Sequence, residues 1–213
     1  MRLVLVGGGG HASDVLGAIE AVNHLANREL TEFIDVVGLV ADDEIDMARF
    51  KGRGVRQIGA LDDLGHLDIS HYVVCVGYPT ARKAVTDRIR RFGLAAATVV
   101  HPRAWLSSGV EFGAGSVALA GVCVSPLAHI GEHVYLSHGV LIGHDTRVLD
   151  FVSVMPGASV SGDVTVGRCA LIGSNAAVLE KLNIGESSVV GAGAVVTRDI
   201  PANLVAKGIP AKF

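Results

Sequence analysis

The stretch VSGDVTVGRCALIGSNAAV, residues 160–178, decides the fold, because it carries an apolar residue at every sixth position. The same period runs without a change of phase through most of the second half of the chain. Glycine often follows the periodic residue directly, and small or β-branched residues often occupy the position four after it. All fifteen positions of the series are apolar: Phe112, Ala118, Val124, Ile130, Leu136, Ile142, Val148, Val154, Val160, Val166, Ile172, Val178, Ile184, Val190 and Val196.

A period of six has a direct physical interpretation. If three units of six form one triangular turn, a coil closes after about 18 residues with its periodic side chains inside. Glycine at the next position is then expected to let the backbone bend there without a clash from a side chain. Five such coils, stacked at about 4.8 Å like neighbouring strands, give a prism about 24 Å long. An ordinary β-sandwich would instead show alternating strands separated by irregular turns, so the constant phase favours an all-β parallel β-helix.

The first part of the chain has a different texture, in which apolar strands alternate with helical patterns. Strands that alternate with helices predict a small parallel sheet. We therefore expect a Rossmann-like α/β domain over residues 1–98 and a β-helical domain over residues 99–213. The predicted strands are 2–6, 36–40 and 72–76, and the predicted helices are 12–25 and 80–92, the second helix with Arg82, Lys83, Arg88 and Arg90 on its solvent side.

Composition narrows the classes of function. The 213 residues are 50% hydrophobic and include 18 Lys and Arg against 21 Asp and Glu. No basic run could follow a phosphate backbone, so we expect no nucleic-acid partner. No apolar run reaches the roughly 18 residues that span a bilayer, and the N-terminal MRLVLVGGGGH is too short for a signal-peptide core, so we expect no membrane insertion. The three cysteines lack a disulfide or zinc spacing, which favours reduced thiols in the cytoplasm.

Three segments together carry a resemblance to a known family. They are the glycine-rich opening of the first domain, the GHD segment at residues 143–145 and the GIPAK segment at residues 208–212. With the six-residue repeats, the chain resembles hexapeptide-repeat sugar acetyltransferases of the sialic-acid/bacillosamine type. The resemblance implies a left-handed parallel β-helix, a homotrimer, and acetyl-CoA-dependent acetylation of an amino group on a nucleotide-activated amino sugar.

The GHD segment interrupts a largely uncharged repeat with His144 and Asp145. One coil away on either side lie Pro126 and Gly162, which leave an open notch around the histidine. A carboxylate bonded to one imidazole nitrogen would fix the tautomer and make the other nitrogen a better base. The resemblance implies the same roles, His144 as general base and Asp145 as its partner. A solvated turn pair is the alternative interpretation.

Small residues suggest where the thioester lies. Ser174 and Ala192 are one coil apart and form a smooth wall, although the coil itself also favours small residues. The resemblance implies that acyl-CoA lies between two β-helices of a trimer, with Gly208 and Lys212 at its nucleotide end. At the position seven before the base, where related enzymes often carry asparagine, this chain has Ser137. The predicted acyl-CoA residues are Ser153, Gly162, Ser174, Ala192, Gly208 and Lys212.

The acceptor is expected in the first domain. Gly7, Gly9 and Ala12 fit a GxGxxA pattern between a strand and a helix, which aims backbone N–H groups at phosphate. Asp42 lies too far from the glycines for the usual dinucleotide spacing, so a nucleotide-sugar fits better than NAD. The resemblance implies three groups of contacts: Gly9, Gly10 and His11 with the sugar diphosphate, Asp42 and Asp43 with the nucleoside, and Gly77 along the same crevice. His11 as a mere helix cap is the alternative.

Three other functions remain open on this fold. An O-acetyltransferase would acylate a sugar hydroxyl, and a non-catalytic trimeric scaffold would need no base. A metal hydratase resembling γ-class carbonic anhydrases would need about three imidazoles around one zinc ion. The spacing of His129, His133, His138 and His144 carries the chain onto different faces, so we expect no metal. Cys123 and Cys169 lack a neighbouring histidine and carboxylate, which favours direct transfer without a covalent acyl-enzyme.

Overall fold

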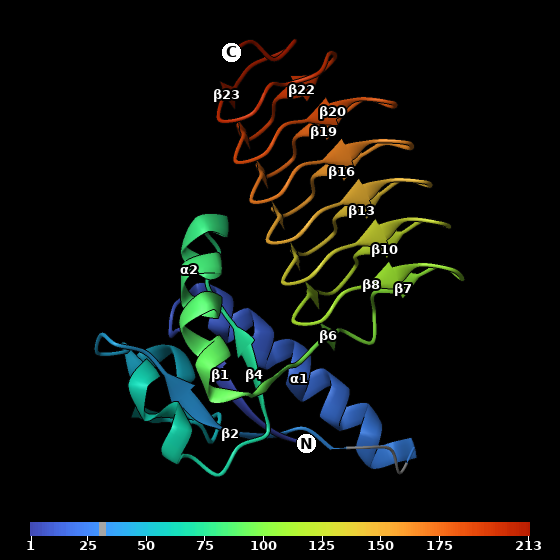
Figure 1. Ribbon diagram of the computed structural model, residues 1–213. Coiled ribbons are helices and arrows are strands. Elements are labelled where there is room, and N and C mark those ends of the chain that lie inside the picture. Colours follow the sequence, from blue (N-terminus) through green and yellow to red (C-terminus); the bar gives the residue numbers. More distant parts are fainter. Residues whose placement is uncertain (30–32) are drawn as a thin grey trace.

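The computed structural model describes residues 1–29 and 33–213, and it shows a tall β-helical prism standing on a smaller α/β unit (Figure 1). The α/β unit contains a five-stranded parallel sheet of order β3-β2-β1-β4-β5. Its strands are β1 (Arg2–Val6), β2 (Asp35–Val40), β3 (Gln57–Gly59), β4 (His71–Val74) and β5 (Ala95–Ala96). Its helices are α1 (Gly10–Glu29) and α2 (Pro79–Ile89), with short 3-10 helices η1 (Met47–Phe50), η2 (Leu61–His66) and η3 (Arg90–Phe92).

The predicted parallel sheet is confirmed, with all three expected strands and both expected helices. Sequence inspection missed β3 and β5, because two or three residues are too few to show a period. The last strand of this sheet ends at Ala96, and the first strand of the prism begins at Val99.

The prism consists of two-residue strands that pair in parallel with strands one coil away, as Cys123 does with Leu141. The predicted left-handed β-helix of 18-residue coils is thereby confirmed. The seven-stranded sheet contains β6 (Val99–Val100), β9 (Val117–Ala118), β12 (Tyr135–Leu136), β15 (Ser153–Val154), β18 (Leu171–Ile172), β21 (Val189–Val190) and β23 (Val205–Ala206). The six-stranded sheet contains β7 (Trp105–Leu106), β10 (Cys123–Val124), β13 (Leu141–Ile142), β16 (Ser159–Val160), β19 (Ala177–Val178) and β22 (Val195–Val196). The prism's five-stranded sheet, hereafter the five-stranded sheet, contains β8 (Glu111–Phe112), β11 (His129–Ile130), β14 (Arg147–Val148), β17 (Thr165–Val166) and β20 (Asn183–Ile184).

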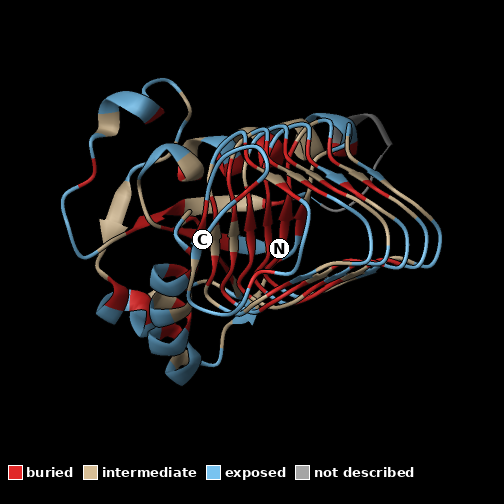
Figure 2. Cartoon of the chain, turned by 90° about the horizontal axis from the view of Figure 1, so that it is seen from above, coloured by how far each residue is buried: buried red, intermediate tan, exposed pale blue. Residues whose placement is uncertain are grey.

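The periodic apolar residues fill the interior of the prism, where Figure 2 shows the buried strands. From Ala118 to Val196 each of them is at most 2% exposed. Phe112, in the first complete coil, is only partly buried. Burial of this continuous apolar column is the main stabilising contribution that the repeat makes.

The expectation that glycine after the periodic residue lets the backbone bend is wrong. The left-handed conformation falls two residues after these glycines, at His133, Asp145 and Cys169 among others. The preceding glycines are needed for another reason, because a Cβ on Gly143 would lie 2.4 Å from the backbone nitrogen of Gly162. Glycine in this column therefore allows neighbouring coils to stack closely, and the turn itself tolerates other residues.

The two units share one apolar core. Val99, Val117, Leu119 and Tyr135 of the prism pack with buried residues of β1 and α1, and α1 runs beneath β6 (Figure 1). The expectation that Arg82 faces solvent is wrong, since its side chain is 2% exposed and reaches into the prism. In the described ranges 1–29 and 33–213, no helix has the length and apolar character needed to cross a membrane.

Candidate active site

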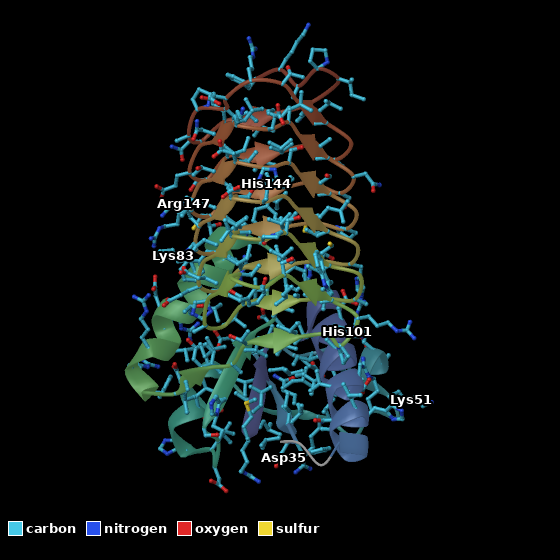
Figure 3. All side chains as sticks on the ribbon, turned by 90° about the vertical axis from the view of Figure 1, so that its right-hand side faces the viewer. Asp35, Lys51, Lys83, His101, His144 and Arg147 are labelled. Carbon is cyan, nitrogen blue, oxygen red and sulfur yellow. The ribbon has the colours of Figure 1, made fainter. Side chains whose placement is uncertain are left out.

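His144 and Asp145 form a close pair on the surface of the prism. His144 Nδ1 lies 2.7 Å from Asp145 Oδ2, and the two side chains are 68% and 51% exposed. The pair occupies the turn between β13 and β14, which is the edge between the six-stranded and five-stranded sheets (Figure 3). With a carboxylate at Nδ1, the neutral imidazole carries its proton there and offers Nε2 as an acceptor.

Backbone geometry explains how adjacent residues can point toward each other. Asp145 has a φ of 57°, a left-handed conformation that aspartate tolerates better than most residues. Its N–H donates to the carbonyl of Pro126 in the coil before, and the N–H of Asp163 in the coil after donates to the carbonyl of His144. Backbone hydrogen bonds to the neighbouring coils therefore hold the pair in place on both sides.

Gly162 provides the space that the imidazole occupies. A Cβ built on Gly162 would lie 2.6 Å from His144 Nε2 and 2.7 Å from Cε1. The predicted notch around His144 therefore exists, and it depends on the absence of a side chain one coil away.

A polar groove of about 450 Å³ borders the pair on the five-stranded sheet. Asp145 and Arg147 line one end of it, and His129 and Glu111 line the other. His129 Nδ1 lies 2.6 Å from Glu111 Oε2, so the groove contains a second histidine–carboxylate contact.

The glycine-rich segment of the α/β unit leaves an open surface at the start of α1. Gly7 requires glycine because its φ is 108°, and Gly8 because a Cβ would lie 2.4 Å from Ile45. At Gly9 and Gly10, no atom of the described residues lies within 4 Å of a built Cβ. Packing therefore does not explain these two glycines, whereas close approach of a ligand to the backbone would.

Asp42 and Asp43 follow β2 at the carboxyl end of the sheet. Gly9 and Asp43 line a crevice of about 400 Å³, and both aspartates line an adjoining one of about 200 Å³. Asp42 already has protein partners, because Arg88 and the N–H of Leu61 donate to its carboxylate. The hydrogen bond from Arg88 is the main reason that the pKa of Asp42 is lowered. Asp43 is the freer of the two for a ligand hydroxyl.

His11 and Gly77 meet where the two units join. A Cβ on Gly77 would lie 2.3 Å from the His11 ring, and the ring of Tyr135 lies 4.6 Å from that of His11. Burial lowers the pKa of His11, so its imidazole is neutral at pH 7. Ser153 is fully buried beside them and donates from its hydroxyl to the carbonyl of Gly77 at 2.7 Å. In this chain Ser153 therefore contacts the Gly77 turn.

The remaining predicted acyl-CoA residues lie on another edge of the prism. Ser174 follows β18, Ala192 follows β21, and Gly208 and Lys212 follow β23, all at the edge between the seven-stranded and six-stranded sheets. Ser174 is half-buried and the other three are exposed. A single chain thus brings Gly162 to His144 but leaves these four on a different edge.

The histidines do not gather into one site. His129 pairs with Glu111 and His144 with Asp145, while His133 is buried between the rings of Tyr72 and Phe151. Among the residues that the structure describes, no group of three or more His, Cys, Asp or Glu is placed to hold a metal ion.

Sequence inspection missed the residues that join the units, above all Arg82 and Tyr135. A signal for Arg82 was present, because it shares the inner face of α2 with Pro79, Thr86 and Ile89 at spacings of three and four residues. The charge of Arg82 suggests exposure to solvent, whereas its position on that stripe predicts burial. Nothing in the repeat distinguishes Tyr135 from an exposed residue at the same place in the next six-residue unit, such as Leu141.

Solved structures of high overall similarity share both units. PerB from Caulobacter crescentus, in complex with CoA and GDP-perosamine, is 30% identical, with 100% of this chain and 96% of that chain covered and a TM-score of 0.87. The acetyltransferase domain of PglB from Neisseria gonorrhoeae, in complex with acetyl coenzyme A, is 26% identical, with coverage of 99% and 98% and a TM-score of 0.86.

Matches to curated proteins are short. Galactoside O-acetyltransferase from Escherichia coli is 55% identical over 31 residues, which are 15% of this chain. The chain spans about 15% of the length of the curated relatives it matches. No protein-family model matches the sequence.

Proposed function

The chain belongs to the hexapeptide-repeat sugar acetyltransferases, and on this premise we propose that it acetylates an amino group of a nucleotide-activated amino sugar with acetyl-CoA. The observation that carries the proposal is His144, oriented by Asp145 at Nδ1 and standing over Gly162 with Nε2 available. The CoA and GDP-perosamine bound to the similar PerB support both substrate classes.

The reaction is a direct transfer. The sugar amine attacks the thioester carbonyl, its proton passes to Nε2 of His144, and the C–S bond breaks to release CoA. The oxyanion of the tetrahedral intermediate is stabilised by a backbone N–H. No thiol nucleophile is involved, because Cys75 and Cys169 are buried and Cys123 has no base beside it in sequence.

The acceptor binds at the carboxyl end of the parallel sheet. Its diphosphate lies against the N–H groups at Gly9 and Gly10, where the positive end of the α1 dipole favours negative charge. The nucleoside contacts Asp43, with Asp42 at the adjoining crevice, and the sugar extends past His11 and Gly77 toward the prism.

A homotrimer completes the site. Ser153 contacts the Gly77 turn from the seven-stranded sheet, while His144 lies on the edge opposite that sheet, so one chain separates the acceptor crevice from the base. Trp105 and Leu141 expose apolar surface along the six-stranded sheet, which suits contact with a second copy. A neighbouring chain would bring its Ser174 edge to His144 and enclose the thioester. The free thiols fit a reducing compartment, and we place the reaction in the cytoplasm.

The test is release of CoA thiol from acetyl-CoA in the presence of a panel of nucleotide-activated amino sugars. One or more members should give release well above thioester hydrolysis, with a product heavier by one acetyl group. Treatment with neutral hydroxylamine separates the products, since it cleaves an O-acetyl ester and leaves an amide. No release with any amino sugar would contradict the proposal, and a hydroxylamine-sensitive product would favour the O-acetyltransferase.

The oligomer has its own test by sedimentation equilibrium. The wild type should be a trimer at micromolar concentration, and Leu141→Glu should shift it toward monomer, because a carboxylate replaces exposed apolar surface. A wild-type monomer at that concentration would contradict the shared site.

A further inference from the structure

Arg82 crosses the junction between the two units with an almost completely buried side chain. It projects from α2 of the α/β unit, is 2% exposed, and donates hydrogen bonds to five backbone carbonyls. All five N–H groups of its guanidinium have an acceptor. Nε donates to His133 O at 2.9 Å, Nη1 to Val76 O at 2.7 Å and Gly77 O at 3.2 Å, and Nη2 to Phe151 O at 2.9 Å and Val152 O at 3.0 Å.

These acceptors belong to two separate parts of the chain. Three carbonyls lie in two successive coils of the prism, and the other two lie in the turn after β4 in the α/β unit. A planar guanidinium with a fixed fork holds its acceptors at set positions relative to one another. Arg82 therefore fixes the Val76–Gly77 turn relative to the coils, which an apolar residue of similar volume could not do.

Among the residues that the structure describes, no carboxylate is bonded to Arg82, so the burial of its charge needs a reason. Desolvation lowers its pKa to about 10, which still leaves the guanidinium charged at pH 7. A buried charge is a poor source of stability compared with a well-packed apolar residue, even where its hydrogen bonds are satisfied. The geometry that it imposes is a better explanation of its presence than the stability that it contributes.

The fixed turn carries the inner wall of the acceptor crevice. Besides the hydrogen bond from Arg82, Gly77 O accepts one from the prism, which Ser153 Oγ donates at 2.7 Å. The His11 ring rests directly on Gly77 and is flanked by Tyr135 of the prism. A shift of the Gly77 turn would therefore displace the His11 side chain.

We propose that Arg82 is a positioning residue, which fixes the Gly77 turn and the His11 wall of the acceptor crevice on the prism and so sets where the acceptor amine meets the thioester. The inference rests on the proposed function and adds a residue that touches neither substrate. Its effect falls on the acceptor, because its contacts are remote from the edge that carries Ser174 and Ala192.

The kinetic test compares Arg82→Lys with a control from the same helix. A lysine concentrates its donors on one nitrogen and cannot bridge both sets of carbonyls. We expect kcat/KM for the acceptor to fall about tenfold or more, as a misplaced reactant would require, with KM for acetyl-CoA unchanged. The control is Ile89→Val, which removes a methylene group from the α/β core at a residue that does not contact the prism core.

A purely structural role predicts a different pattern. Arg82→Lys and Ile89→Val would then both lower the melting temperature and leave kcat/KM for the acceptor as in the wild type. That result would overturn the proposal. If Arg82→Lys does not fold, Ser153→Ala provides the same test, because it removes the hydrogen bond that the prism itself donates to Gly77 O. An unchanged acceptor kcat/KM in Ser153→Ala would then overturn it.

A second readout does not depend on activity. Hydrogen–deuterium exchange of the full-length protein should show faster exchange at residues 76–79 in Arg82→Lys, with the coils at 165–196 unchanged. Equal exchange at 76–79 in both proteins would contradict a fixed turn. Absence of acetyl transfer by the wild type would count against the proposed function alone, since the exchange experiment would still decide the role of Arg82.

Discussion

Two histidine–carboxylate contacts lie on the outside of the prism, and they differ in where the backbone places them. His144 Nδ1 is 2.7 Å from Asp145, and His129 Nδ1 is 2.6 Å from Glu111. His144 stands on an edge, its partner is the next residue, and Gly162 leaves room for its ring. His129 lies within a strand on the flat face of the five-stranded sheet, and its partner is one coil away.

The two imidazoles differ in the groups that surround them and in whether another chain can approach them. His129 pairs in register with Glu111 on one side and Arg147 on the other, so it belongs to a ladder of charged side chains along one face. His144 has glycine in the corresponding direction and lies at an edge where another chain can approach. A short contact with a carboxylate is therefore not sufficient to identify a base, and the position on the coil decides.

The largest effect is expected for His144→Ala. Loss of a general base lowers kcat by about 10²–10⁴. Folding should be nearly unaffected, because the side chain is 68% exposed and the hydrogen bonds to the neighbouring coils use only its backbone. The measurement is steady-state CoA release together with the melting temperature. If more than about a third of kcat remains, the edge position does not define the base, and His11 or His138 must be tested next.

A third histidine, His133, predicts an effect of pH on stability. Burial is the main cause of its pKa of about 4, with Arg82 and Arg90 also lowering it and Asp150 and Asp87 opposing them. The unfolded chain takes up a proton near pH 6.5, whereas the folded chain does so only near pH 4. Stability is therefore lost as pH falls through this window, by about 3 kcal/mol at most. Urea unfolding between pH 4.5 and 7.5 measures it.

The matched variant for this effect is His133→Phe. A phenyl ring keeps the stacking on Phe151, and Phe151 itself shows that this side chain is compatible with the left-handed turn. We expect a shallower pH dependence in the variant, with a remainder from His11, whose pKa is also lowered by burial. A slope identical to that of the wild type would assign the acid sensitivity to other groups.

A smaller effect is expected for Asp145→Asn. Asparagine tolerates the φ of 57° and can still accept a hydrogen bond from Nδ1, so the turn and the ring orientation are largely kept. The lost charge weakens stabilisation of the protonated imidazole, and kcat should fall about tenfold. CoA release under the conditions used for His144→Ala gives the comparison. A loss as large as that of His144→Ala would show that the aspartate has a role beyond orienting the base.

The interior of the prism could be predicted from sequence because one local rule repeats. An apolar residue at each sixth position, such as Val166 and Ile172, is buried from Ala118 to Val196. The same rule located the notch at His144, since Gly162 is one coil away. It did not show why glycine follows the periodic residue, because that requirement comes from the backbone of the adjacent coil and not from the local turn.

The junction between the units could not be predicted in the same way. The period does not indicate which sheet of the prism packs on the α/β unit, so it could not predict that the hydroxyl of Ser153 contacts Gly77. The burial of Arg82 could not be predicted from its acceptors for a related reason, since these come from residues 76 to 152 and meet only in the folded chain. Contacts of this kind depend on the placement of whole units.

The smallest effect is expected for His129→Ala, which removes the other member of the comparison. An exposed contact of this kind is worth about 0–1 kcal/mol at most, and its loss should change neither folding nor chemistry by much. We therefore expect kcat within about twofold of the wild type, with Glu111→Gln behaving alike because it removes the partner charge. The assay is the one used for His144→Ala, with KM measured for both substrates. A rise in KM alone would place the 450 Å³ groove on a substrate path. A tenfold fall in kcat would mean that a histidine on the flat face also takes part in proton transfer. The position at the edge would then not be sufficient to identify the base.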